Sequence, residues 1–212
     1  SDTAALGFAG SWYYGTDRKQ EGIRYFDKLA LLCPDNQDAL ILQAELAYVE
    51  KDYPRMFGIC GKILKLKDAR PELKLNVLGM MGDAYAGTDD YDAAFKCYEK
   101  ALRIDPEYVY VLNNYAYFLS LKGKKLKKAA SMSKITVDAA PDNATYLDTY
   151  GWILFLQGKY SQAKLQFKRA MIYGGKDSKV ILEHYSEVLK ALGENDLADH
   201  YRSLAEQRKD EN

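Results

Sequence analysis

Several residue types that would mark particular classes of protein are scarce in this sequence. It contains three cysteines, Cys33, Cys60 and Cys97, and this small, odd number argues against a disulfide framework, so we expect buried free thiols. Its 30 basic and 30 acidic residues cancel, so the net charge gives no reason to expect nucleic-acid binding. No apolar run approaches the roughly 20 residues that span a bilayer, and residues 1–15 have no basic segment ahead of an apolar one. We therefore expect no transmembrane segment.

Motifs for catalysis and for metal or cofactor binding are also missing. The two histidines are His184 and His200, and no second histidine or cysteine stands at ligand spacing from His184, so we interpret it as a surface residue. No strand precedes the glycines of "GMMGDAYAG", which favours helix packing over a phosphate-binding loop. No serine or cysteine lies in a recognisable nucleophile motif. The sequence predicts a non-enzymatic protein with no cofactor and no metal.

What the sequence does contain is a helical hairpin over residues 75–108. Apolar and small residues follow helical spacing in two runs, first Leu78, Met81, Gly82 and Tyr85, then Tyr91, Ala94, Phe95, Tyr98, Ala101 and Leu102. Between the runs, Gly87 is expected to end one helix in a left-handed conformation, and an aspartate of Asp89-Asp90 is expected to cap the next. Pro106 then closes the hairpin, because proline suits the first turn of a following helix but disfavours helix in the residue before it.

The hairpin pattern recurs about every 34 residues. Gly82, Tyr91, Ala94, Tyr98 and Ala101 correspond to Gly151, Tyr160, Ala163, Phe167 and Ala170. Weaker copies complete about six hairpins, at 3–36, 37–70, 75–108, 109–143, 144–178 and 179–212. About four extra residues around Pro71 precede the third copy, and the fourth needs one extra residue in its turn. Because a lone hairpin cannot bury its apolar face, neighbouring hairpins must stack, and the sequence predicts an all-α repeat fold.

Small and large residues alternate within this pattern in a way that predicts close helix packing. Glycine or alanine at positions such as Gly82 and Gly151 lets helix axes approach, while Tyr98 and Phe167 supply large buried areas beside them. The first helix, "AALGFAGSWYY", is apolar on nearly every side, whereas the last is amphipathic and suits a cap. We therefore expect this chain to be the C-terminal part of a longer array.

The repeated pattern resembles the tetratricopeptide repeat family, in its bacterial multi-repeat type, over essentially the whole chain. The resemblance implies a right-handed superhelical solenoid of helix-turn-helix hairpins, forming a single domain over residues 1–212. It also implies a protein–protein interaction scaffold in which the first helix of each hairpin lines a concave groove for a peptide or partner helix. The block "YLDTYGWILFLQGKYSQA" is most similar to bacterial proteins that often carry an export signal. The resemblance alone thus suggests the cell envelope or periplasm, with the cytoplasm as the alternative.

The groove-facing positions implied for the C-terminal half are acidic and aromatic. They are Tyr110, Asn113, Asn114, Tyr117, Asp148, Trp152, Phe155, Glu183 and Glu187. We expect Tyr117, Trp152 and Phe155 to anchor an apolar side chain, and the two asparagines to hydrogen-bond a peptide backbone. The expected partner is a neutral-to-basic protein or peptide segment with apolar anchors. The alternatives are core or inter-repeat packing for the aromatic residues and a merely solvated face for the acids.

Three further hypotheses concern other parts of the surface. One subset of the family binds C-terminal carboxylates through groove cations, but Asp83, Asp148 and Glu183 stand where cations would be wanted, so that activity is not predicted. The lysine run "LKGKKLKKAASMSK" is either a solvated turn or a contact for anionic lipid or an acidic protein. As a structural alternative to groove binding, the convex face or the exposed first helix mediates self-association.

Overall fold

The computed structural model describes residues 3–208, so both ends of the predicted 1–212 domain lie outside the described residues. Within that range every regular element is helical and there is no strand, which confirms the all-α prediction. The chain forms two compact units that divide after Pro106. The single-domain boundary over residues 1–212 stays a prediction.

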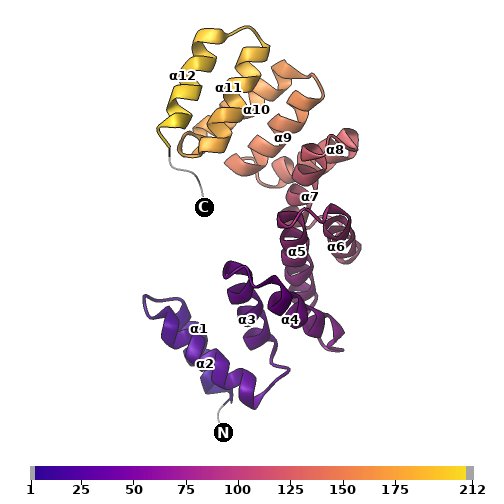
Figure 1. Cartoon of the computed structure of the whole chain (residues 1–212), viewed down its shortest axis with the longest axis vertical. Helices are drawn as coiled ribbons and strands as arrows, with labels where there is room; N and C mark the ends of the chain where they lie inside the picture. Colours follow the sequence, from indigo (N-terminus) through magenta and orange to yellow (C-terminus); the bar gives the residue numbers. More distant parts are fainter. Residues whose placement is uncertain (1–2, 209–212) are drawn as a thin grey trace. The chain divides into compact units, whose positions relative to one another are not determined.

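Unit 1 contains three helical hairpins (Figure 1). Its helices are α1 (Thr3–Tyr14), α2 (Lys19–Leu32), α3 (Gln37–Val49), α4 (Tyr53–Lys65), α5 (Pro71–Gly87) and α6 (Tyr91–Ile104). They pack in pairs, α1 with α2, α3 with α4 and α5 with α6, and the pairs contact one another through α2 and α3 and through α4 and α5. Stacking of successive hairpins is the arrangement that the repeat pattern predicted.

Unit 2 repeats the same arrangement. Its helices are α7 (Val109–Leu121), α8 (Leu126–Ala139), α9 (Ala144–Leu156), α10 (Tyr160–Ile172), α11 (Lys179–Ala191) and α12 (Asn195–Glu206), with a short 3-10 helix η1 (Gly175–Asp177) before α11. The core of the last two hairpins is centred on Phe167 and Tyr185, whose rings stack with centroids 5.6 Å apart. Both side chains are buried, so they hold α10 against α11.

The predicted pairing of small and aromatic residues is confirmed in three hairpins. A Cβ atom on Gly10, Gly82 or Gly151 would lie 2.8, 2.3 or 2.7 Å from the ring of the aromatic residue that packs on it, which is closer than carbon atoms can approach. The rings belong to Phe26, Tyr98 and Phe167, respectively. Each glycine is therefore required because the second helix of its hairpin lays a ring directly on the backbone of the first.

The turn between α5 and α6 is partly as predicted. Asp90 caps α6, since its carboxylate accepts the backbone N–H of Ala93 at 3.1 Å. The prediction for Gly87 is wrong: it is the last residue of α5, and the left-handed residue is Asp89, with φ of 62°. Aspartate tolerates this conformation better than most residues, because its short polar side chain can satisfy nearby backbone groups.

Two irregularities in the repeat spacing have structural causes. The extra residues near Pro71 do not form a loop; they extend α5, which begins at Pro71, where proline is favoured because its missing N–H needs no helical partner. Between α7 and α8 the linking residues run from Lys122 to Lys125, one more than the linking residues 157–159 of the next hairpin. The sequence predicted this longer turn.

The cysteines are free thiols, as expected, but they are not all buried. Cys60 and Cys97 are buried, and Cys33 is partly exposed at the end of α2. Burial raises the pKa of Cys60 to about 12 and also raises the pKa of Cys97. Among the described residues, no helix is both long enough and apolar enough to cross a membrane.

Candidate functional site

The candidate site lies on the first helices of the three hairpins in unit 2. Helix α9 packs against α7 on one side and α11 on the other, so the outward sides of these three helices form one surface. We call this surface the α7/α9/α11 face and define it by Tyr117, Asp148, Trp152, Phe155 and His184. The first four are candidate residues from the sequence, and His184 is added by the structure.

A hydrogen-bonded pair joins α9 to α11 at the centre of this face. His184 Nδ1 lies 2.8 Å from Asp148 Oδ1, and the side chains are only 18% and 9% exposed. The interpretation of His184 as a surface residue is therefore wrong. Its partner is 36 residues earlier in the chain, so a search for ligands along the same helix could not find it. The sequence contains one signal for this contact: Asp148 and His184 both lie on the first helices of successive hairpins.

Aromatic rings extend from this pair toward the end of α9. Trp152 stacks on the imidazole of His184, with centroids 4.1 Å apart and planes 17° apart, and on Phe155, at 4.8 Å and 21°. The ring centroid of Phe155 in turn lies 5.5 Å from that of Tyr160, the first residue of α10. Trp152 and Phe155 are both partly exposed. Each ring therefore packs against a neighbour, as the packing alternative expects, and still presents surface to solvent; the anchor role of Trp152 and Phe155 stays a prediction.

Helix α7 contributes Tyr117 to the same face. Burial, with a smaller contribution from the negative charge of Asp148, raises the pKa of Tyr117, so its hydroxyl stays protonated at neutral pH and can donate a hydrogen bond. Asn113 is buried, and its Nδ2 donates to Asn114 Oδ1 at 3.2 Å. Of the two asparagines, only Asn114 is partly exposed, and Tyr110 is exposed one turn earlier.

The structure separates the two glutamates from the aromatic residues. Glu187 Oε1 accepts a hydrogen bond from Arg202 Nη2 of α12 at 2.5 Å. Both glutamates line a hollow between α11 and α12 with Arg202, Ala205 and Glu206. Because each residue turns about 100° around a helix axis, residues 183 and 187 point toward α12 while His184 points toward α9. The acidic group beside the aromatic rings is therefore Asp148.

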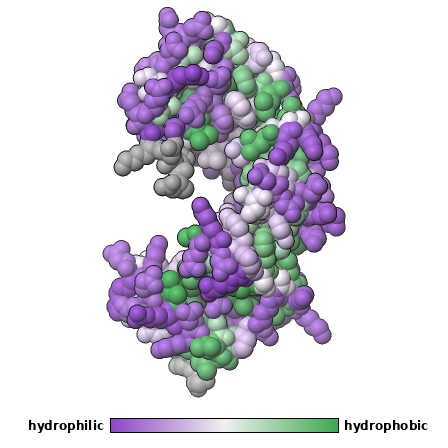
Figure 2. Space-filling model, in the orientation of Figure 1, coloured by the Kyte–Doolittle hydropathy of each residue, from purple (hydrophilic) through white to green (hydrophobic). Residues whose placement is uncertain are grey.

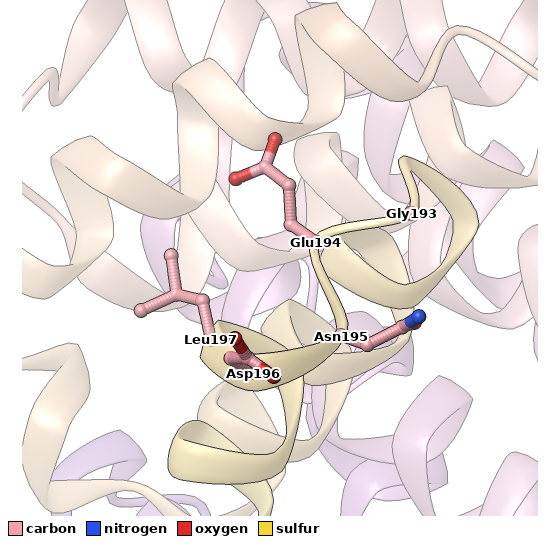
Figure 3. Close-up of a pocket in the computed structure, with 5 residues that line it drawn as sticks. All are labelled: Gly193, Glu194, Asn195, Asp196 and Leu197. Atoms are coloured by element: carbon pink, nitrogen blue, oxygen red, sulfur yellow. The ribbon is translucent and has the colours of Figure 1, made fainter.

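A second hollow lies at the α11–α12 turn and is lined by residues 193–197. Figure 3 shows the side chains of Glu194 and Leu197 on one side of this turn and that of Asn195 on the other. The carboxylate of Glu194 already pairs with Lys164 Nζ at 2.5 Å. The hollow thus lacks a group of polar side chains directed at one point. Across residues 3–208, no cluster of three or more histidine, cysteine, aspartate or glutamate side chains is placed to hold a metal ion.

Unit 1 exposes a different kind of surface at its first hairpin. Phe8 and Trp12 of α1 are 72% and 65% exposed, and their rings stack with centroids 6.5 Å apart. Leu31 and Leu32 at the end of α2 are also exposed. Figure 2 shows hydrophobic side chains on the surface at the end of the unit that carries the N-terminus. This patch is the second candidate contact surface.

Family comparison supports the interpretation of the repeats. Two tetratricopeptide repeat family models match the chain, one over residues 75–108 and the other over residues 97–129. Residues 75–129 therefore carry tetratricopeptide repeats. The first match has the boundaries that the sequence predicts for the third hairpin, and the second continues into α8.

Solved structures with the same fold cover nearly all of this tetratricopeptide repeat chain. PilW, described as a widely conserved type IV pilus biogenesis factor, has a TM-score of 0.77 at 17% identity, covering 95% of this chain and 90% of PilW. MamA from Desulfovibrio magneticus RS-1 has a TM-score of 0.57 at 14% identity, and the match covers 98% of this chain and 94% of the MamA chain. At these identities the likeness shows the fold, a solenoid of helical hairpins.

Curated relatives match part of the chain. The DnaJ protein P58IPK homolog of Arabidopsis thaliana is 33% identical over 141 residues, and homolog A of Oryza sativa subsp. japonica is 31% identical over 134 residues. These alignments take in 64% and 58% of this chain, but only 28% and 27% of the relatives. This tetratricopeptide repeat chain therefore spans little more than a quarter of their length. Because plant and bacterial proteins are both similar to this chain, its assignment to the bacterial multi-repeat type stays a prediction.

The family and the fold together give the general function. Tetratricopeptide repeat proteins bind protein partners, and scaffolds of this kind are generally non-enzymatic. The chain is a protein–protein interaction module.

Proposed function

We propose that the α7/α9/α11 face binds an extended segment of a partner protein, with Trp152 and Phe155 as the anchors. The observation that carries this proposal is the stacked, partly exposed pair of rings held in place by the Asp148–His184 hydrogen bond. Rings that are already fixed lose little conformational entropy on binding, and aromatic residues supply much of the binding energy at protein interfaces. Tyr117 extends the apolar surface to α7 and offers a hydroxyl to a peptide backbone.

The chemistry around the rings favours a neutral-to-basic segment. Asp148 places a carboxylate one helical turn from Trp152, and the face of an indole attracts lysine and arginine side chains. Glu183 adds an exposed acid farther from the rings, on the side of α11 that faces α12. We therefore expect the partner segment to carry a lysine or arginine close to an aromatic or aliphatic residue. Its association rate should fall as salt rises, because the attraction between opposite charges is screened.

A random peptide library displayed on phage provides a test that does not require a known partner. The library is selected on the wild-type chain, and the enriched peptides are then titrated against wild type, Trp152→Ala and Leu165→Ala. Leu165 is the matched control, because it is an exposed apolar residue on the second helix of the same hairpin. Loss of an anchor residue costs at least about 2 kcal/mol, or roughly 30-fold in affinity. We expect that loss for Trp152→Ala and no change for Leu165→Ala.

Two controls make this result interpretable. Thermal melts must show that both variants fold, and Trp152→Phe should keep most of the affinity because a phenylalanine ring can still stack on Phe155 and His184. Enriched peptides that bind wild type and Trp152→Ala equally well would place binding elsewhere. Peptides rich in acidic residues would contradict the expected partner chemistry.

The exposed patch on the first hairpin favours a second candidate function, self-association. Stacked aromatic rings as exposed as Phe8 and Trp12 are unusual on a monomer, and exposed apolar patches commonly mark contact surfaces. If two copies associate through this patch, light scattering will show a mass that rises with concentration, and Trp12→Glu will abolish the rise. A concentration-independent monomer would reject this candidate and leave the proposal for α7/α9/α11 unaffected.

A further inference from the structure

Two neighbouring turns of unit 2 concentrate lysine side chains with no acid among them. We call this surface the lysine edge; it consists of Lys122, Lys124, Lys125, Lys127 and Lys128 at the α7–α8 turn and Lys159 at the α9–α10 turn. All six are exposed. The two turns are adjacent, because Gln157 Nε2 donates a hydrogen bond to the backbone carbonyl of Leu126 at 2.9 Å. No aspartate or glutamate occurs in residues 108–137 or 149–176, although the whole chain has no net charge.

Folding does not account for three of these six charges. Lys128 Nζ donates to the hydroxyl of Tyr115 at 3.1 Å, which gives that lysine a structural role. Lys124, Lys125 and Lys127 form no ion pair within residues 3–208. The first turn of α8 has no acid, and its N-cap residue Lys125 makes no side-chain capping bond. Positive charges near a helix N-terminus are unfavourable because they repel the positive end of the helix dipole.

Large apolar side chains are exposed along the same edge. Leu121 is the last residue of α7, Leu156 is the last residue of α9, and Tyr160 is the first residue of α10, and all three are exposed. Lysines next to exposed leucine and tyrosine make an amphipathic surface, because the apolar groups can enter a lipid interface while the ammonium groups reach the headgroups.

We propose that the lysine edge binds the surface of an anionic lipid bilayer. A bilayer is favoured over an acidic protein because the edge contains only lysine, whose single charge on a flexible stem suits a fluid surface of spread negative charge. Recognition of fixed carboxylates is better served by the planar, bidentate guanidinium of arginine, and the edge has no arginine. The exposed leucines and tyrosine also favour lipid. This proposal is independent of the peptide-binding function of the α7/α9/α11 face.

Vesicle sedimentation of the whole chain tests the proposal directly. Vesicles of phosphatidylcholine mixed with an equal amount of phosphatidylglycerol should sediment the protein, and vesicles of phosphatidylcholine alone should not. Each lysine close to an anionic surface contributes about five-fold to binding, so the triple variant Lys124→Gln, Lys125→Gln and Lys127→Gln should bind roughly 100-fold more weakly. The control is Lys67→Gln, Lys168→Gln and Lys176→Gln, which removes three exposed lysines elsewhere and should change binding only a few-fold.

Two further measurements separate lipid binding from loss of folding and from a general attraction to polyanions. Lys127→Glu should weaken vesicle binding while leaving the melting temperature unchanged or higher, since an acid in the first turn of α8 favours the helix. Leu121→Ser should weaken vesicle binding without changing the charge. Equal losses in the two triple variants, equal sedimentation with both kinds of vesicle, or binding to soluble polyglutamate but not to vesicles would each overturn the proposal.

Discussion

The contact between Gly82 and Tyr98 gives the most direct prediction about the fold. A Cβ atom on Gly82 would lie 2.3 Å from Tyr98 Cε1 and 2.7 Å from Cδ1. The ring cannot easily move away, because Tyr98 is fully buried and its hydroxyl donates to Asp83 Oδ1 at 2.6 Å. Gly82→Ala therefore forces α5 and α6 apart or distorts the ring contact.

The size of the effect follows from two opposing contributions. Overpacking a core costs about 1 to 3 kcal/mol. Replacing glycine by alanine inside a helix stabilises the fold by about 1 kcal/mol, because alanine has the higher helix propensity. Gly58 in α4 is the matched control in the same unit, since a Cβ there meets nothing within 4 Å. Gly82→Ala should thus be less stable than Gly58→Ala by about 1 to 3 kcal/mol, because the propensity contribution is common to both.

The assay is urea denaturation of the two variants and wild type, followed by circular dichroism. Wild type should fall between the variants, with Gly58→Ala the most stable. In a Tyr98→Leu background the two alanine variants should have similar free energies of unfolding, because the ring that meets the new Cβ is gone. If Gly82→Ala is as stable as Gly58→Ala in the wild-type background, the close packing of small and aromatic residues described here is wrong.

Two other predictions concern buried polar chemistry. At mildly alkaline pH iodoacetamide should alkylate Cys33 in the native chain but not Cys60 or Cys97, because burial raises the pKa of Cys60 and of Cys97 and leaves little thiolate. Mass spectrometry before and after unfolding in urea measures the labelling. Equal labelling rates of the three cysteines in the native chain would contradict the prediction. His184→Leu should lower the free energy of unfolding by about 1 to 3 kcal/mol, because it leaves the carboxylate of Asp148 buried without its partner. Adding Asp148→Leu should recover part of this stability. If urea denaturation shows that the two substitutions lower stability additively, the pairing is contradicted.

Much of the fold could be predicted because the repeat pattern encodes local packing. Gly82 and Tyr98 recur as Gly151 and Phe167, so one contact is specified more than once in the sequence, and helix periodicity alone shows that the two residues face each other. The left-handed residue of the α5–α6 turn was harder to predict. Gly87 and Asp89 both tolerate that conformation, and the choice depends on how far α5 continues.

The candidate site was less predictable, because it depends on contacts between hairpins. Periodicity places Trp152 and Phe155 on the outward side of α9, but it does not show that His184 of the next hairpin stacks on the indole. Similarly, Glu183 and Glu187 belong to a first helix, yet the rotation of α11 turns them toward α12. Such relations need the relative rotation of successive hairpins, which the sequence pattern specifies only approximately.

Hydrogen–deuterium exchange can show directly whether a partner segment lies on the α7/α9/α11 face. Exchange is measured by mass spectrometry with and without an excess of a peptide selected from the library. We expect slower exchange in α7, α9 and α11, centred on the segments that contain Trp152 and His184. Protection confined to the second helices α8, α10 and α12, or to the first hairpin of unit 1, would contradict it.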